Sequence, residues 1–255
     1  MGTALITGAS AGLGLEFARQ LAAAQHDLVL VARNKERLDE VAQDIRATTG
    51  VAVEVLPADL SVHDDVESVA ARLAATGAGS GPAPVGLLVN NAGFATPGRF
   101  TGGGATGEMA GVDVMVRAVV RLSHAAVQQM VARGRGAVLN VSSVAALTAG
   151  GTYAAAKAYV LSFTEGLAVD LKGTGVTATV VCPGFTHTEF HDRAGIPKSS
   201  VPSWGWLDAP SVVRQALADV RRGVVISTPS VRYAVASAVL RAMPRWAVRA
   251  VGKLR

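Results

Sequence analysis

Short apolar segments with the character of β-strands alternate with helix-forming segments along all 255 residues of the chain. The strand candidates are residues 3–7, 27–32, 51–56, 85–90, 136–141, 175–181 and 223–228; helix candidates fall near 12–25, 34–48, 62–75, 108–133, 152–172, 209–221 and 230–253. This alternation predicts a parallel sheet with helices on both faces. Half of the residues are hydrophobic and 17% are charged, which suits strands buried on both faces. We therefore predict an α/β fold, a doubly wound parallel sheet of about seven strands in three layers.

The chain shows no clear boundary between domains. The most linker-like stretch, residues 76–84, is short and typical of a surface loop before a strand, so we expect one domain over 1–255. No apolar run reaches the roughly 18 residues that span a bilayer. The first strand begins at once and the single cysteine, Cys182, excludes an internal disulfide, so we expect a cytoplasmic protein.

The first strand candidate, Thr3–Thr7, runs into the loop Gly8-Ala-Ser-Ala-Gly12-Leu-Gly14 and then into a helix-forming segment. Glycines let the backbone approach an anion, and a helix N-terminus offers unpaired N–H groups and a positive dipole. The loop therefore predicts a phosphate cradle. A tight turn without a ligand is the alternative.

Tyr153 and Lys157 lie four residues apart in a predicted helix and so share one face. A nearby cation favours the phenolate, so we expect the ammonium to lower the pKa of the tyrosine. A tyrosine of this kind exchanges a proton with a carbonyl or an alcohol near neutral pH.

Six sequence blocks identify the chain as resembling the short-chain dehydrogenase/reductase family, in its compact branch with a Rossmann-type fold. They are Thr7-Gly-Ala-Ser-Ala-Gly-Leu-Gly14, Ala58-Asp-Leu60, Asn90-Asn-Ala-Gly93, Val141-Ser-Ser143, Tyr153-x-x-x-Lys157 and Pro183-Gly184. They occur in the family's order over about residues 3–190. The resemblance implies a nicotinamide dinucleotide bound by Gly8, Ser10, Ala11, Gly12, Leu13, Gly14, Asp59, Leu60, Asn90, Ala92, Gly93, Tyr153, Lys157, Pro183, Gly184, Thr186 and Thr188.

Arg33 follows the second strand, where dinucleotide folds meet the adenosine ribose. An acidic residue at this point binds the 2′-hydroxyl of NAD, whereas an arginine accommodates the 2′-phosphate of NADP. The sequence thus predicts NADP(H), with NAD(H) as the alternative if Arg33 is only a solvated residue.

The resemblance also implies the chemical roles. Tyr153 is the acid/base residue, Lys157 lowers its pKa and holds the nicotinamide ribose, and Ser143 polarises the carbonyl, with Ser142 as the alternative. Asp113 stands where the family usually has an asparagine that holds a relay water. The loop between Ser143 and Tyr153 is short for the family. We therefore expect the surface on which the substrate rests to differ from that of other members.

The leading hypothesis is an NADP(H)-dependent oxidoreductase of a ketone or secondary alcohol. An epimerase or dehydratase is disfavoured by the glycine spacing, and a non-catalytic NADP-binding scaffold or redox sensor is the remaining alternative. His187 and His191 are four apart, but no third ligand is in view, so we expect no metal.

Three further expectations concern surfaces. Residues 187–207 are predicted to form a substrate lid. Four aromatic residues either give that lid an apolar lining or pack in the core: Phe185, Phe190, Trp204 and Trp206. The segment 230–255 carries Arg241, Arg245, Arg249 and Lys253 at intervals of four, interrupted by Pro244, and is a candidate for peripheral membrane contact. The helices 108–133 and 152–172 resemble those that form family dimers and tetramers. We find no nucleic-acid motif.

Overall fold

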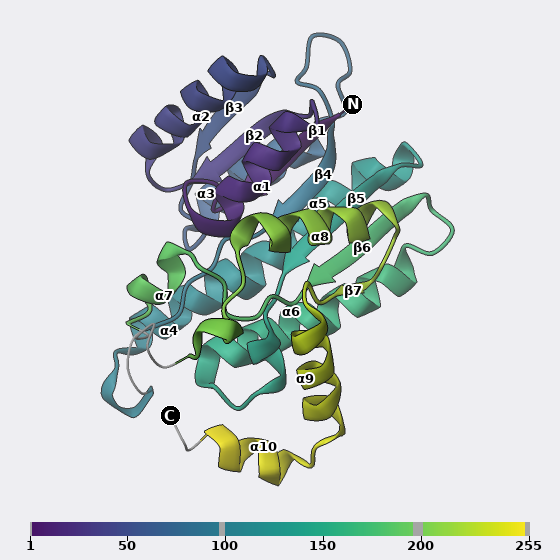
Figure 1. Cartoon of the computed structure of the whole chain (residues 1–255). Helices are drawn as coiled ribbons and strands as arrows, with labels where there is room; N and C mark the ends of the chain where they lie inside the picture. The colour runs from purple at the N-terminus through teal and green to yellow at the C-terminus, as the bar shows by residue number, and fades with distance from the viewer. Residues whose placement is uncertain (1, 97–99, 196–200, 253–255) are drawn as a thin grey trace.

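The computed structural model describes residues 2–96, 100–195 and 201–252. Within them, seven strands form one parallel sheet: β1 (Thr3–Thr7), β2 (Asp27–Ala32), β3 (Val53–Pro57), β4 (Val85–Asn90), β5 (Gly136–Val141), β6 (Val176–Val181) and β7 (Ile226–Ser227). Their spatial order is β3-β2-β1-β4-β5-β6-β7 (Figure 1). The order changes direction between β1 and β4, and such a switch point opens a crevice at the carboxyl ends of the strands. The predicted doubly wound, Rossmann-type fold is confirmed.

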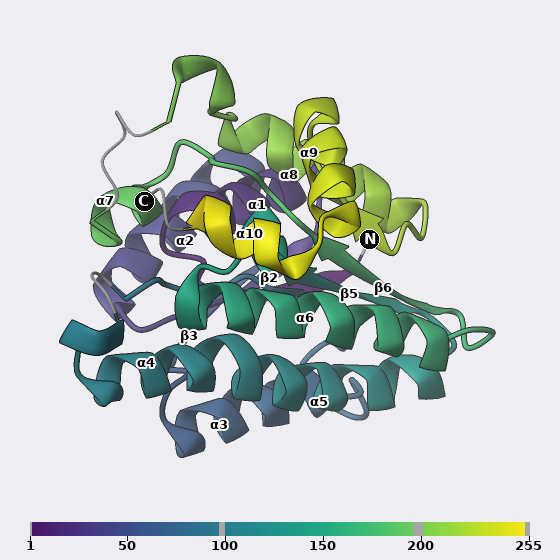
Figure 2. The ribbon, with the colours of Figure 1, turned by 90° about the horizontal axis from the view of Figure 1, so that it is seen from below.

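Helices cover both faces of the sheet (Figure 2). One layer contains α1 (Gly12–Ala23), α2 (Lys35–Thr49) and α8 (Ala209–Arg221). The other contains α3 (His63–Ala74), α5 (Ala118–Ala132) and α6 (Gly151–Asp170). Side chains alternate between the faces along each strand, so Ile6 packs in the first layer's core and Leu5 in the second's. All five residues of β1 are buried, as expected for a central parallel strand.

The predicted helix over 108–133 is longer and less regular than its periodicity indicates. It begins as α4 (Ala105–Val112), passes through one π-helical turn, η2 (Asp113–Arg117), and continues as α5. Such π-helical turns occur mostly inside α-helices and often at functional sites.

The predicted C-terminal helix over 230–253 is two helices, α9 (Val231–Ala242) and α10 (Arg245–Gly252). Pro244 separates them because the residue before a proline avoids the helical region, and Met243 is extended with ψ 138°. The last strand is also shorter than the predicted 223–228, since only Ile226 and Ser227 pair with β6.

Shorter elements complete the described chain: η1 (Phe100–Gly102), η3 (Val144–Leu147), α7 (Glu189–Arg193) and η5 (Ser203–Gly205). Across the described ranges, no helix is both long and apolar enough to cross a membrane.

Candidate active site

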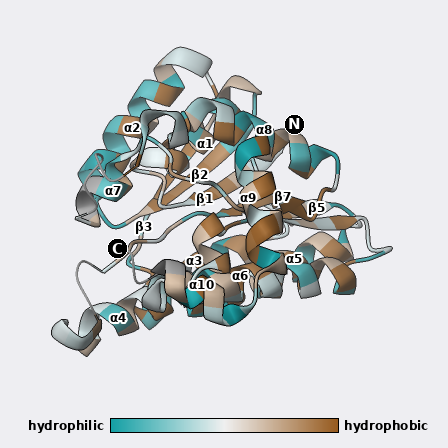
Figure 3. Cartoon of the chain, turned by 60° about the horizontal axis from the view of Figure 1, so that its bottom comes forward, coloured by the Kyte–Doolittle hydropathy of each residue, from teal (hydrophilic) through white to brown (hydrophobic). Residues whose placement is uncertain are grey.

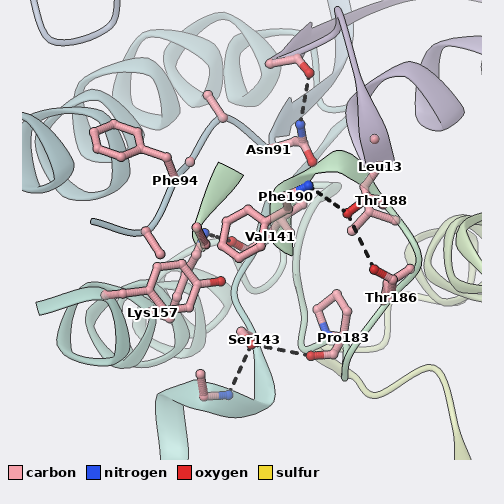
Figure 4. A pocket seen from close by; sticks show the side chains of 18 of the residues that line it. Leu13, Asn91, Phe94, Val141, Ser143, Lys157, Pro183, Thr186, Thr188 and Phe190 are labelled. Atoms are coloured by element: carbon pink, nitrogen blue, oxygen red, sulfur yellow. Dashed lines mark hydrogen bonds between the residues drawn. The ribbon is translucent and has the colours of Figure 1, made fainter. Parts of the chain in front are cut away.

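A cavity of about 910 Å³ lies at the carboxyl ends of the strands, where the sheet order switches (Figure 4). The loop after β1, the ends of β2 to β6, helix α6, the segment after β6 and helix α9 all contribute to its wall. Most of the predicted site residues line it: Gly8, Ser10, Ala11, Gly12, Leu13, Arg33, Asp59, Leu60, Ala92, Gly93, Ser143, Tyr153, Lys157, Pro183, Gly184, Thr186 and Thr188.

The glycine loop has the conformation that its sequence predicts. Gly8 and Gly12 have φ of +66° and +55°, a region that favours glycine. No side chain caps the first turn of α1, and that turn holds no acidic residue. The helix N-terminus is therefore open to an anion approaching from the cavity.

Gly14 lies behind the loop and outside the cavity lining. A Cβ atom on Gly14 would lie 2.1 Å from the carbonyl oxygen of Gly8 and 2.5 Å from Nδ2 of Asn91. Gly14 thus allows α1 to pack directly against the loop, whereas we expected it to line the cofactor site.

Arg33 and Asp59 line the cavity close to each other, where we expected the adenosine of the cofactor. The Arg33 side chain is 73% exposed, and its Nη1 lies 3.9 Å from Oδ2 of Asp59. Burial works to raise the pKa of Asp59, but hydrogen bonds from the N–H and hydroxyl of Ser61, with Arg33 nearby, bring it below the usual range. Neither Asp59 nor Ser61 caps α3, whose N-cap is Val62.

The Asn90–Gly93 block divides into a buried and an open part. Asn90 is buried and lies outside the cavity lining, where its Nδ2 donates to Ser123 at 3.1 Å and to Asn140 at 2.9 Å. Asn91 instead lines the cavity and donates to the carbonyl oxygen of Thr7 at 2.9 Å. We expected Asn90 to meet the cofactor; the structure gives it a bracing position between β4, β5 and α5 and places Asn91 at the surface of the cavity.

Ser143, not Ser142, has a hydroxyl presented to Tyr153. The Ser142 hydroxyl is buried and donates to the carbonyl oxygen of Lys157 at 2.7 Å. Ser143 accepts the N–H of Ala145 at 3.1 Å, and its hydroxyl lies 3.5 Å from the carbonyl oxygen of Pro183. Burial raises the pKa of Tyr153 to about 12, and a hydrogen bond with Ser143 opposes part of this rise.

The direction of the Tyr153 shift differs from our expectation. The ammonium Nζ of Lys157 lies 5.7 Å from the centre of the tyrosine ring and donates to the carbonyl oxygen of Val141 at 2.8 Å. Burial lowers the pKa of Lys157 to about 8. Removal of both groups from water therefore dominates over their mutual attraction.

Asp113, the position of the expected relay residue, does not line the cavity. It opens the π-helical turn, and its Oδ1 accepts from Nη1 of Arg117 at 2.8 Å. From this stretch of helix, Ala110 and Val114 line the cavity.

The segment after β6 carries an aromatic cluster over the site. Phe190 on α7 lies against Tyr153, with ring centres 5.5 Å apart. His187 stacks on Trp206 at 4.6 Å, and His191 meets the same ring edge-on at 4.8 Å. Phe185 and Phe190 line the cavity, whereas Trp206 is buried in the cluster and Trp204 is exposed. Residues 196–200 of the predicted lid lie outside the described residues.

The two histidines are ring partners in this cluster. The part of the chain that the structure describes holds no group of three metal-ligating side chains.

The cavity residues that the sequence did not predict include Arg37, Glu189, Tyr233 and Ser237. Arg37 lies in the first turn of α2, four residues after Arg33, and forms two hydrogen bonds to Glu189 on α7, at 3.2 and 2.5 Å. Its closeness to Arg33 in the sequence is the signal that points to Arg37. Glu189, Tyr233 and Ser237 carry no such local signal, because only the tertiary fold brings α7 and α9 to the cavity.

Tyr233 holds helix α9 against the wall of the cavity. Its ring occupies the space over Gly184, where a Cβ would lie 2.1 Å from the ring. Its hydroxyl donates to the carbonyl oxygen of Gly205 at 2.7 Å and accepts from the N–H of Phe185 at 3.2 Å. Gly184 is thus required by the packing of Tyr233 against the backbone.

These features fit a nicotinamide dinucleotide. The loop with positive φ angles and the uncapped α1 N-terminus suit the diphosphate, and Arg33 and Asp59 stand where the adenosine would lie. Gly93, whose Cβ would lie 3.3 Å from Nζ of Lys157, leaves room beside that ammonium.

Comparison with known proteins agrees with this geometry. The family model for short chain dehydrogenases matches residues 2–196. A curated relative, a ketoacyl reductase of a Nostoc species, is 30% identical over 202 residues, covering 77% of this chain and 68% of the relative.

Solved structures resemble almost the whole chain. A short-chain dehydrogenase from Sphingobium yanoikuyae in complex with NADPH is 36% identical, with a TM-score of 0.85 over 94% of this chain and 92% of that one. A bulky-bulky ketone specific alcohol dehydrogenase from Comamonas testosteroni is 29% identical, with a TM-score of 0.79 over 96% of each chain. A Burkholderia phymatum short-chain dehydrogenase/reductase in complex with NAD is 25% identical, with a TM-score of 0.80 over 92% and 91%. Sequence, fold and site together show that the chain belongs to the short-chain dehydrogenase/reductase family of oxidoreductases.

Proposed function

We propose that this chain transfers a hydride between NADP(H) and an apolar ketone or secondary alcohol, with Tyr153 as the acid/base residue. The observation that carries the proposal is the set of residues that line the cavity at the carboxyl ends of the strands. It joins the glycine loop and Arg33 at one end to Ser143, Tyr153 and Lys157 at the other.

The bound dinucleotide supplies or accepts the hydride at its nicotinamide ring. Tyr153 donates its phenolic proton to the oxygen of the carbonyl as that oxygen gains negative charge, and accepts the proton in the reverse reaction. The Ser143 hydroxyl donates a hydrogen bond to the same oxygen and holds the carbonyl in place. Lys157, fixed by its bond to Val141, contributes a positive charge beside the tyrosine.

The pKa of Tyr153 favours the reductive direction. With a pKa of about 12, the phenol is protonated at neutral pH and ready to act as the acid. In the oxidative direction the same group must first lose its proton, so we expect alcohol oxidation to require higher pH than ketone reduction.

The preference for NADP(H) rests on two arginines at the adenosine end. Arg33 lines the cavity, and Arg37, in the first turn of α2, adds a second guanidinium. Guanidinium groups bind phosphate through paired hydrogen bonds. Arg37 already pairs with Glu189, so a 2′-phosphate would share Arg37 with the lid helix α7.

Apolar side chains line the substrate end of the cavity beside the catalytic hydroxyls, together with the hydroxyl of Ser237. Phe185, Phe190 and Leu240 line it. Ser237 is 7% exposed, faces the same cavity, and its Oγ has no hydrogen-bond partner among the described residues. A buried hydroxyl without a partner is costly, so we propose that Ser237 binds a second polar atom of the substrate.

The first experiment titrates purified protein with NADPH and NADH by nicotinamide fluorescence, with Arg33→Ala alongside. We expect tighter NADPH binding that the variant loses. Tighter NADH binding would overturn the preference.

The second experiment screens bulky apolar ketones with NADPH. Tyr153→Phe should lower kcat about 10²-fold or more while NADPH affinity is kept. Tyr159→Phe is the matched control, since Tyr159 is a partly exposed tyrosine of the same helix outside the cavity lining. NADPH binding with no turnover of any ketone would instead favour a scaffold or redox sensor.

We further propose a homodimer or homotetramer built through α5 and α6. Tyr159 and Phe163 stack at 6.1 Å on the outside of α6, and Val169 on the same helix is 72% exposed. Burial of these side chains in a subunit interface would remove apolar surface from water. Light scattering on the native protein and on Val169→Glu measures the subunit number. The single buried Cys182 suits the reducing cytoplasm that we propose as its compartment.

A further inference from the structure

The positive charge of this protein is concentrated at its C-terminal end. Eight of its 24 Lys and Arg residues follow Asp219, whereas none of its 19 Asp and Glu residues does. The part up to Asp219 holds 16 basic and 19 acidic residues, so it is slightly acidic. The formal charge of +5 therefore comes from the last 36 residues alone.

Helix α9 presents an apolar stripe to solvent. Val231, Val235 and Val239 occur at intervals of four and are 81%, 59% and 53% exposed. At 100° per residue, Ala238 and Ala242 fall on the same outer face, while Arg232 and Arg241 flank it on opposite edges. Figure 3 shows brown, hydrophobic residues along α9.

Helix α10 continues this surface. Val248 is buried and anchors the helix, whereas Trp246 is 68% exposed between the exposed side chains of Arg245 and Arg249. Tryptophan with arginine is the combination that favours a membrane–water interface. We call the exposed side chains of α9 and α10 the C-terminal face. Lys253 of the predicted basic stripe lies outside the described residues.

The inner side of α9 belongs to the cavity. Tyr233, Ser237 and Leu240 line the proposed substrate end, so one helix separates that cavity from the apolar stripe. We propose that the C-terminal face docks on an anionic lipid surface, and that α9 is the wall beside which a membrane-dissolved carbonyl compound enters the cavity. The entry step rests on the proposed function; the docking does not.

Charge and chemistry favour lipid over other occupants. A symmetric contact between two copies would bring the same arginines together, and like charges oppose such an interface. Between the flanking arginines the outer face of α9 offers only valine and alanine, without a hydrogen-bonding group for a specific protein partner. Headgroup phosphates suit the arginines, and the acyl boundary suits the valines and Trp246.

Vesicle co-sedimentation of the full-length protein tests the docking. The probes are phosphatidylcholine vesicles with and without about a third of phosphatidylglycerol. We expect binding to the anionic vesicles that weakens with salt. A basic residue near such a surface contributes roughly 1 kcal/mol, or about fivefold in affinity, so Arg241→Glu with Arg249→Glu should weaken binding at least 25-fold.

The matched control reverses two exposed charges elsewhere, Arg135→Glu with Lys172→Glu, for the same change in net charge. Its vesicle binding should fall much less than that of the Arg241/Arg249 variant. Val235→Asp tests the apolar stripe and should weaken binding even where salt has screened the arginines. The proposal is overturned if the native protein does not sediment with anionic vesicles, or if the two charge-reversal variants lose vesicle binding equally. Salt-sensitive self-association without lipid binding would also overturn it.

Activity separates the docking from the chemistry. Turnover of a water-soluble ketone and NADPH affinity should be unchanged in the Arg241/Arg249 variant, because neither residue lines the cavity. Turnover of a long-chain 2-alkanone dissolved in anionic vesicles should fall in parallel with vesicle binding. If vesicles bind but no ketone turns over, the proposed function fails and the docking stands; if the alkanone is reduced equally by both proteins, entry beside α9 is refuted.

Discussion

Lys157 is buried, and burial disfavours its charged form. Replacement of Lys157 by methionine tests whether the folded protein holds this charge at a cost in stability. The pKa of Lys157 falls from 10.5 to about 8 on folding. Below pH 8 the folded protein must keep this ammonium protonated at a cost of about 3 kcal/mol, from about 1.4 kcal/mol per pKa unit. Between pH 8 and 10.5 the unfolded chain binds more protons at this site, so this contribution to stability rises with pH.

We therefore expect the stability difference between native protein and Lys157→Met to depend on pH. The free energy of unfolding of the native protein should gain about 2 kcal/mol relative to the variant between pH 7 and 9.5. Loss of the bond from Nζ to Val141 destabilises the variant by a nearly constant amount and does not alter this slope. The assay is urea unfolding followed by tryptophan fluorescence at half-unit pH steps.

The difference between the two proteins isolates Lys157 from the other buried groups. Burial raises the pKa of Cys182 from 9.0 to about 11 and that of Tyr153 from 10.0 to about 12. As the pH rises above the pKa that each group has in the unfolded chain, both groups therefore lower the free energy of unfolding. Both groups are present in each protein. Lys172→Met, at an exposed lysine, is the control and should show no such slope. If the difference in free energy of unfolding between the native protein and Lys157→Met does not change with pH, the assignment of a charged Lys157 destabilised by burial is refuted.

Three further changes test the packing that positions the site. Gly14→Ala places a Cβ 2.1 Å from the Gly8 carbonyl oxygen and should cost about 2–3 kcal/mol in urea unfolding, whereas Gly86→Ala, whose nearest contact is 3.8 Å, should cost less than about 1 kcal/mol. Asn140→Ala removes one hydrogen bond each from two buried partners, Asn90 in β4 and Thr164 in α6, and should cost about 2 kcal/mol, with strong non-additivity alongside Asn90→Ala. Tyr233→Phe removes the hydroxyl that joins α9 to Phe185 and Gly205 in the segment after β6. Amide exchange over 185–195 should therefore speed up about fivefold, and unchanged exchange would contradict that link.

Much of the fold and part of the site could be predicted from the sequence because they depend on local properties. Buried parallel strands require apolar runs, so the bounds of β1, β2, β4 and β5 match the prediction. The glycine spacing similarly predicts the loop of positive φ before α1, since few other residues adopt it. The motif order along the chain then places the site at one sheet edge, because the carboxyl ends of parallel strands meet there.

Only the tertiary structure decided which side chains share the cavity and in what state of charge. Asn90 and Asn91 are neighbours in sequence, yet one braces the core and the other faces the cavity. Spacing predicted a lowered pKa for Tyr153, but burial raises it, and burial is the sum of contacts from segments far apart in the chain. Ser237 reaches the site for the same reason, because the packing of Tyr233 over Gly184 sets the position of α9. Local sequence thus determined the scaffold, whereas solvent exclusion by distant segments determined the chemistry of the groups within it.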